Sequence, residues 1–193
     1  MRQSLLWFPS VAAFATTGLL VTAVRPYYSD GPPPARTGGF GEGTCRECHK
    51  SEPLNAPGGI LRIDSLPAEG YEPGHIYRLY VVMTKPGMGR GGYQLTVRAD
   101  ERNAKNVQAG SLALLDDRSQ FSTMNFGPIQ YLQHTKKGTA LSAPDTSRWL
   151  FRWRAPEKGG PVVFHVAANA ANNDNSEVGD YIYTAEFHII PAP

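Results

Sequence analysis

Two cysteines and a histidine lie close together near the start of the chain: Cys45, Cys48 and His49, within the stretch GEGTCRECHKSE (residues 41–52). The chain has no other cysteine. Two thiols three residues apart can form a redox pair, help to hold a metal ion, or anchor a haem whose iron the adjacent histidine binds. A disulfide here would close only a very small loop and add little stability. The spacing therefore predicts a chemical role for this stretch.

The residues around the two cysteines favour haem over the other possibilities. A thioredoxin-like pair needs a βαβ context and a helix N-terminus that lowers the thiol pKa, whereas this motif lies in a Gly- and Pro-rich stretch. A structural zinc site needs four ligands, and the sequence has no second paired motif. We predict one covalent haem c, with Cys45 and Cys48 as thioethers and His49 as proximal iron ligand. A simple disulfide and a metal site are the alternatives.

An apolar stretch near the start of the chain predicts export. Residues 5–24, LLWFPSVAAFATTGLLVTAV, carry no charge, and Arg2 precedes them. A helix of about 20 residues can cross the hydrocarbon core of a bilayer, while residues 21–23, VTA, would serve as a signal cleavage site. A retained transmembrane anchor and a cleaved signal both stay open. Either one predicts a periplasmic or cell-surface protein, and we expect it to be anchored to the cytoplasmic membrane.

Composition limits the remaining function classes. Of the 193 residues, 41% are apolar, which is enough for a core, and 19% are charged, with a net charge of +2. This charge gives no electrostatic case for nucleic-acid binding. We divide the chain into the signal or anchor (1–24), a Pro/Gly-rich linker (25–44), a haem-attachment segment (45–59) and a larger domain (60–193).

In the larger domain, apolar and polar residues alternate in short runs separated by Gly, Pro, Asn and Asp. One run has Tyr93, Leu95 and Val97 on one face and Gln94, Thr96 and Arg98 on the other; similar runs lie at 76–82, 111–115, 128–134, 149–154, 162–166 and 181–189. This period is typical of strands in a sandwich whose sheets each have one face in water. The predicted fold class is all-β, an immunoglobulin-like β-sandwich.

The sixth iron ligand is harder to assign. The candidates are His75, His134, His165, His188, Met83, Met88 and Met124. Strand alternation places His165 and His188 on the outward face, and His75 lies in a turn, so these three are expected to be surface or structural residues. Met88 and Met124 lie in loops, and His134 ends a strand. The spacing alone leaves the choice open.

The order of several short elements in residues 60–190 resembles the reelin-type (reeler) domain: YEPGHIYRLYV, GGYQLTVRA, QAGSLAL, WLFRWRAP and GGPVVFHVAANAAN. The chain is similar to bacterial exported reeler-like (choice-of-anchor) proteins, in which a segment like ARTGGFGEGTCRECH precedes the sandwich and YLQHT and GDYIYT elements lie within it. The resemblance implies a reeler-like sandwich with one covalent haem at its N-terminal edge. Because the His-Thr element matches His134, the resemblance ranks His134 first as distal ligand, Met124 second and Met88 third.

These features predict a membrane-tethered or exported monohaem c-type cytochrome that transfers electrons. It would act with a redox partner protein, or as a subunit of a larger membrane redox or photosynthetic complex. The alternative is an extracytoplasmic adhesion or scaffold module with a structural or sensory haem. The sequence offers no nucleophile triad or paired catalytic residues, so we expect no enzyme.

A cluster of amide and carboxylate side chains in residues 169–180 is a further candidate, for calcium. Its residues are Asn169, Asn172, Asn173, Asp174, Asn175 and Asp180. Hairpin loops of this composition are also common without a metal, so the calcium hypothesis stays open.

Overall fold

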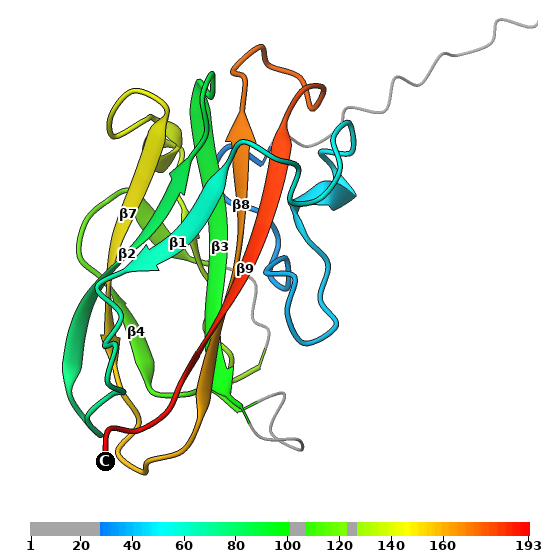
Figure 1. Cartoon of the computed structure of the whole chain (residues 1–193). Coiled ribbons are helices and arrows are strands. Elements are labelled where there is room, and N and C mark those ends of the chain that lie inside the picture. The colour runs from blue at the N-terminus through cyan, green and yellow to red at the C-terminus, as the bar shows by residue number, and fades with distance from the viewer. Residues whose placement is uncertain (1–27, 101–106, 123–126) are drawn as a thin grey trace, which may run out of the picture.

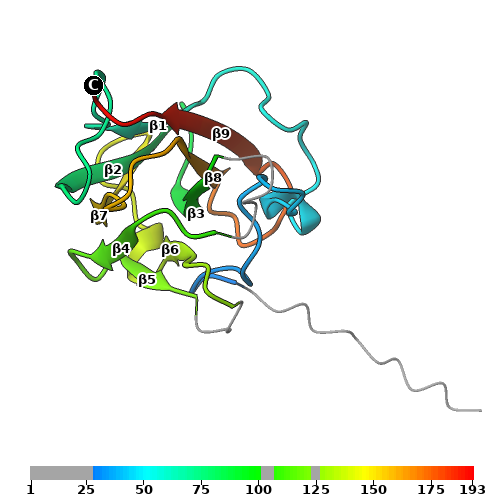
Figure 2. The same ribbon diagram turned by 90° about the horizontal axis from the view of Figure 1, so that it is seen from below.

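The structure is a computed structural model that describes residues 28–100, 107–122 and 127–193. Two antiparallel sheets pack face to face (Figures 1 and 2). The first has the order β1-β2-β7-β4, with β1 (Ile60–Asp64), β2 (Ile76–Thr84), β4 (Ser111–Leu114) and β7 (Thr146–Arg154). The second has the order β5-β6-β3-β8-β9, with β3 (Arg90–Ala99), β5 (Ser119–Phe121), β6 (Leu132–His134), β8 (Val162–Ala171) and β9 (Tyr181–Ile189). The predicted all-β sandwich is confirmed.

Helical structure in the described ranges is limited to two short 3-10 helices, η1 (Cys45–Glu47) and η2 (Lys137–Thr139). Within those ranges no helix has the length and apolar character needed to span a membrane. The predicted signal or anchor, residues 1–24, lies outside the described residues.

The core lies between the sheets and follows the alternation in the sequence. In β7, Trp149, Phe151 and Trp153 are fully buried, whereas Arg148 and Arg152 on the other face are exposed. The indole Nε1 of Trp153 donates to the carbonyl of Ala109 at 3.0 Å, so the polar N–H of this buried side chain has a hydrogen-bond partner. The alternation in the sequence therefore predicts correctly which face of β7 is buried.

Strand β3 differs from the prediction because both of its faces are buried. Gln94 and Thr96 are fully buried and Arg98 is 3% exposed, although the alternation placed all three in water. Residues 28–43, which we call the N-terminal strap, lie on this outer face of the five-stranded sheet (dark blue in Figure 2). The expectation of one wet face per sheet is therefore wrong for this sheet, because part of the predicted linker covers it.

The strap is held by the polar side chains that looked outward in the sequence. The Gln94 amide donates to the Pro33 carbonyl at 2.9 Å, and its carbonyl oxygen accepts the Arg36 N–H at 2.7 Å. The same amide donates to Gln133 of β6 at 2.9 Å. A buried amide is stable only when its polar atoms are paired, so Gln94 depends on the strap.

The two histidines on the outer face of β8 and β9 have different environments. His188 is exposed as expected, and its Nδ1 lies 2.6 Å from Asp100. His165 is instead partly buried, because Phe40 of the strap packs against its ring with the ring centroids 4.6 Å apart.

The pair of His188 and Asp100 predicts a small dependence of stability on pH. The hydrogen bond to Asp100 raises the pKa of His188. The stabilisation is therefore fully present below the unfolded-state pKa of about 6.5 and is lost as pH rises through the higher folded-state pKa. We expect the free energy of unfolding of the wild type to exceed that of His188→Gln by less than about 1 kcal/mol at pH 5.5, since the pair is exposed. Denaturant unfolding from pH 5.5 to 8.5 measures the difference, and a constant difference would contradict the prediction.

Candidate functional site

The C-x-x-C-H motif folds as one tight turn. Thr44 caps η1, with its side-chain oxygen accepting the Arg46 N–H at 3.1 Å. The Cys45 carbonyl then accepts the N–H groups of Cys48 and His49, at 3.3 and 3.1 Å. Both thiols and the imidazole therefore come from the same turn, and η1 lies against β8.

His49 is bound to the hairpin that joins β8 and β9. Its Nδ1 lies 2.7 Å from Oδ2 of Asp180, which is only 1% exposed. The Asn169 amide donates to the same carboxylate oxygen at 3.2 Å and lies 3.4 Å from the His49 ring. A second link joins the two segments, because the Gly179 N–H donates to the Ser51 hydroxyl at 2.8 Å. The motif is thus fixed to the sheet at two points.

His134 is a buried side chain at the end of β6. It is 8% exposed, and its Nδ1 lies 3.0 Å from the nitrogen and 3.2 Å from the carbonyl oxygen of Tyr93. Burial lowers the pKa of His134, against opposing hydrogen bonds with the backbones of Tyr93 and Tyr28. A lowered pKa keeps the imidazole neutral, which is the form that binds metals.

His49 and His134 lie over neighbouring positions on one face of the sheet. The His134 ring lies over Gly92 of β3, so closely that a Cβ on Gly92 would be 2.9 Å from its Cε1. Gly92 pairs with Asn169 of β8, whose amide contacts His49. Paired strands are about 5 Å apart, and the charge of His49 is near enough to contribute to the lowered pKa of His134. The fold therefore brings together two imidazoles that are far apart in the sequence.

These side chains fit a covalent haem by their chemistry. Two thiols lie on the turn that carries the proximal imidazole, and a second neutral imidazole lies on the same face. With Nδ1–H donating to Asp180, the His49 ring keeps Nε2 as a possible metal ligand. In His134, Nδ1 accepts the Tyr93 N–H at 3.0 Å, which places the proton of the neutral ring on Nε2. His134 would have to give up this hydrogen bond and move the proton to Nδ1 before Nε2 could bind a metal. The buried Oδ1 of Asn169 also has no hydrogen-bond partner among the described residues.

The other candidate ligands lie elsewhere. Met88 is 5% exposed in the hydrophobic core between the sheets, and Met124 lies outside the described residues. Within the described ranges no three His, Cys, Asp or Glu side chains are arranged to hold a metal ion. In the hairpin of the calcium hypothesis, Asp174 accepts the Ser176 N–H at 2.8 Å. Cys45 and Cys48 are not joined by a disulfide.

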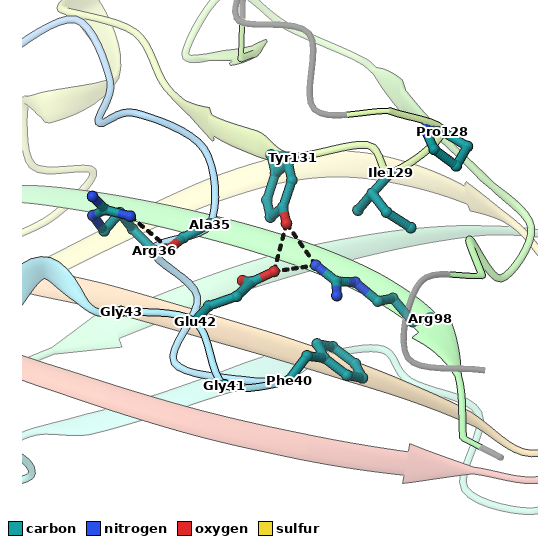
Figure 3. Close-up of a pocket in the computed structure, with 10 residues that line it drawn as sticks. All are labelled: Ala35, Arg36, Phe40, Gly41, Glu42, Gly43, Arg98, Pro128, Ile129 and Tyr131. Carbon is teal, nitrogen blue, oxygen red and sulfur yellow. Dashed lines mark hydrogen bonds and ion pairs between the residues drawn. The ribbon is translucent and has the colours of Figure 1, made fainter. Parts of the chain in front are cut away.

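The strap carries a buried ion pair before it reaches the motif. Figure 3 shows the Glu42 carboxylate between the Arg98 guanidinium, with which it pairs, and the Tyr131 hydroxyl, which donates to it at 2.5 Å. Phe40 stacks on Arg98, with the guanidinium carbon 4.1 Å from the ring centroid. A cavity of ≈ 560 Å³ lies beside this network. The charge pair fixes the end of the strap just ahead of η1.

Sequence reasoning missed the part played by Asp180 and Asn169. Both were assigned to the calcium hypothesis because they lie in an Asn- and Asp-rich stretch. No signal in the sequence separated Asp180 from its neighbours: only the fold shows that Asp180 immediately precedes β9 and is 1% exposed, whereas Asp174 in the hairpin itself is exposed.

The two thiols are expected to differ in reactivity in haem-free protein. Burial raises the pKa of the Cys45 thiol to about 12, whereas Cys48 is exposed. Although Cys45 is partly exposed, its raised pKa keeps the thiol protonated near neutral pH, and only the thiolate is a good nucleophile. We expect iodoacetamide to label Cys48 at least ten times faster than Cys45, as followed by peptide mass spectrometry. Unfolded protein is the control, and equal rates in the folded protein would contradict the prediction.

Comparisons with known proteins gave similarity in fold only. No family model and no curated protein matches the chain. Among solved structures, the human F-spondin reeler domain has a TM-score of 0.46 at 22% identity, covering 69% of this chain and 87% of its own. The Reelin-N domain of F-spondin has a TM-score of 0.45 at 19% identity, covering 76% and 96%. BslA, a bacterial hydrophobin, has a TM-score of 0.37 at 9% identity, covering 74% and 99%. At these values none of them assigns a function to this chain.

Proposed function

We propose that this chain is an exported monohaem c-type cytochrome that transfers electrons, with His49 and His134 as the two axial ligands. One observation carries the proposal: the fold brings a buried neutral imidazole and the imidazole of a C-x-x-C-H turn to neighbouring positions on one sheet face. If the C-x-x-C-H stretch had no haem to bind, there would be no reason for a second histidine to lie beside His49 on the same sheet face.

The chain's own residues would do the following. Cys45 and Cys48 would hold the group covalently, and His49 and His134 would ligate its iron. The haem supplies an iron that gains and loses one electron. Two protein ligands leave no open position for a substrate, which suits a carrier better than a catalyst.

The proposal includes a location and a partner. Covalent attachment at Cys45 and Cys48 takes place outside the cytoplasm, and residues 5–24 would export the chain and, if retained, tether it to the membrane. The partner would then be a redox protein or a membrane redox complex on that side of the membrane.

The test is to express the full chain in a bacterial host that matures exported c-type cytochromes and to measure its mass and its reduced spectrum. We expect a gain of one haem and the sharp α and β bands of a low-spin iron. Cys45→Ala/Cys48→Ala should abolish the covalent gain, while the exposed Ser142→Ala control should keep it. Wild-type protein without haem, or with haem that acid-acetone extracts, would overturn the proposal.

A second candidate is a scaffold or adhesion module whose haem is structural or sensory. The observation that favours it is that His134 already hydrogen-bonds with the backbones of Tyr93 and Tyr28, as a purely structural histidine would. In that case the iron keeps only His49. A high-spin reduced spectrum that changes on adding CO would select this candidate over the carrier.

A further inference from the structure

We propose that Asp180 is the positioning residue for His49: it fixes the Nδ1–H tautomer, directs Nε2 towards the iron and lowers the reduction potential of the haem. This inference rests on the proposed function and assigns to Asp180 a role different from binding calcium.

The geometry fits a fixed acceptor. The carboxylate lies 2.7 Å from Nδ1 of His49, within the range of a charge-assisted hydrogen bond. Its other oxygen accepts the Asn172 N–H at 3.2 Å, and Asn169 donates to the first oxygen at 3.2 Å. At 1% exposure, Asp180 has little contact with water and little freedom to turn away.

The chemistry follows from the charge. Iron binds the lone pair of one ring nitrogen, so the proton must stay on the other, and a carboxylate acceptor holds it there. A carboxylate also withdraws the Nδ1 proton more strongly than a neutral acceptor does, so Nε2 donates more electron density to the metal. Ferric iron carries one more positive charge than ferrous iron. Asp180 should therefore stabilise the ferric state, which lowers the potential.

A merely structural role would look different. Asp180 also ties η1 to the β8–β9 hairpin, but the contact of Ser51 with Gly179 makes a second tie at the same place. If Asp180 only attached η1 to the hairpin, its loss would lower the stability of the protein but would not shift the ferric/ferrous equilibrium towards ferrous iron. The reduction potential of the haem therefore distinguishes a role of Asp180 in positioning His49 from a role in attaching η1 to the hairpin.

The test compares Asp180→Asn with Asp174→Asn in the haem-loaded full-length protein. Both variants remove one negative charge from the same hairpin, but the exposed Asp174 accepts the Ser176 N–H, whereas Asp180 contacts His49. Redox titration should show that Asp180→Asn shifts the ferric/ferrous equilibrium about tenfold towards ferrous, equal to about 59 mV upward for one electron. Asp174→Asn should stay at the wild-type potential.

Equal potentials in the wild type and Asp180→Asn would overturn the inference. If Asp180→Asn does not load haem, nitrogen-15 NMR of wild-type His49 decides instead, in protein with or without haem. In the neutral ring, a proton on Nδ1 with Nε2 bare supports the inference, and a proton on Nε2 with Nδ1 bare overturns it. Failure of the proposed function is a separate result, because it appears as wild-type protein without covalent haem, in which the NMR experiment still tests the contact of His49 with Asp180.

Discussion

Replacing Glu42 by alanine should lower the free energy of unfolding by about 3–5 kcal/mol. The substitution leaves the Arg98 guanidinium, 3% exposed, without the carboxylate that it pairs with, and breaking one side of a buried ion pair has a cost of this size. The Tyr131 hydroxyl also loses the acceptor that it contacts at 2.5 Å. Urea unfolding followed by tryptophan fluorescence measures the change.

The matched control is Glu157→Ala. Glu157 pairs with Arg154 at 2.6 Å, but both side chains are more than half exposed, so the loss should stay below about 1 kcal/mol. Because Glu42 holds the end of the strap, its variant should also label faster at Cys45 with iodoacetamide. Similar losses in the two variants would show that Glu42 and Arg98 do not hold the strap to the sheet.

Replacing His134 by alanine should change the iron from six-coordinate low-spin to five-coordinate high-spin. Under the proposed function, the substitution removes the second iron ligand and leaves His49 as the remaining histidine ligand. The reduced protein should then bind CO, which the wild type should not, and its α band should lose intensity. Optical spectra with and without CO measure both effects.

Two controls separate ligation from packing. His75→Ala removes an exposed histidine beside Glu72 and should leave the spectrum unchanged. Added imidazole should restore the low-spin spectrum of His134→Ala, because it can enter the space left by the side chain and bind the iron. A low-spin spectrum in His134→Ala without imidazole would remove His134 as ligand and favour a different residue.

The sequence predicted the strands whose alternation is regular and missed those without it. β2, β3, β4, β7, β8 and β9 follow the predicted runs, since apolar side chains at every second position bury one face. β1 and β5 were not predicted; β5 has only three residues, too few to show a period. Of the run predicted at residues 128–134, only residues 132–134 form a strand, β6.

The wrong prediction for the outer face of β3 has a physical origin. Gln94 and Arg98 are polar, and polar residues at alternate positions usually face water. Here their partners, Pro33 and Glu42, come from a segment that looks like a linker because of its proline and glycine content. Composition shows that a segment lacks regular secondary structure; it does not show whether that segment is packed.

The residues of the C-x-x-C-H motif could be read from the sequence, but the side chains that contact His49 could not. Cys45, Cys48 and His49 are neighbours in the sequence, so spacing alone brought them together. His134 came from resemblance, and its approach to Gly92 could be seen only once β3 and β6 were paired. Asp180 and Asn169 reach His49 through the register of β8 and β9, which no local pattern encodes.

The long separation between His49 and its partners implies an order of assembly. Asn169 follows His49 by 120 residues, so the contact forms only after the later strands β8 and β9 have been made and paired. Until then the turn with both cysteines is not tied to the sheet, and under the proposed function it would be open to the machinery that attaches haem. Closure of the hairpin would then act as the final step of maturation, trapping a group that could no longer be added once the sandwich had formed.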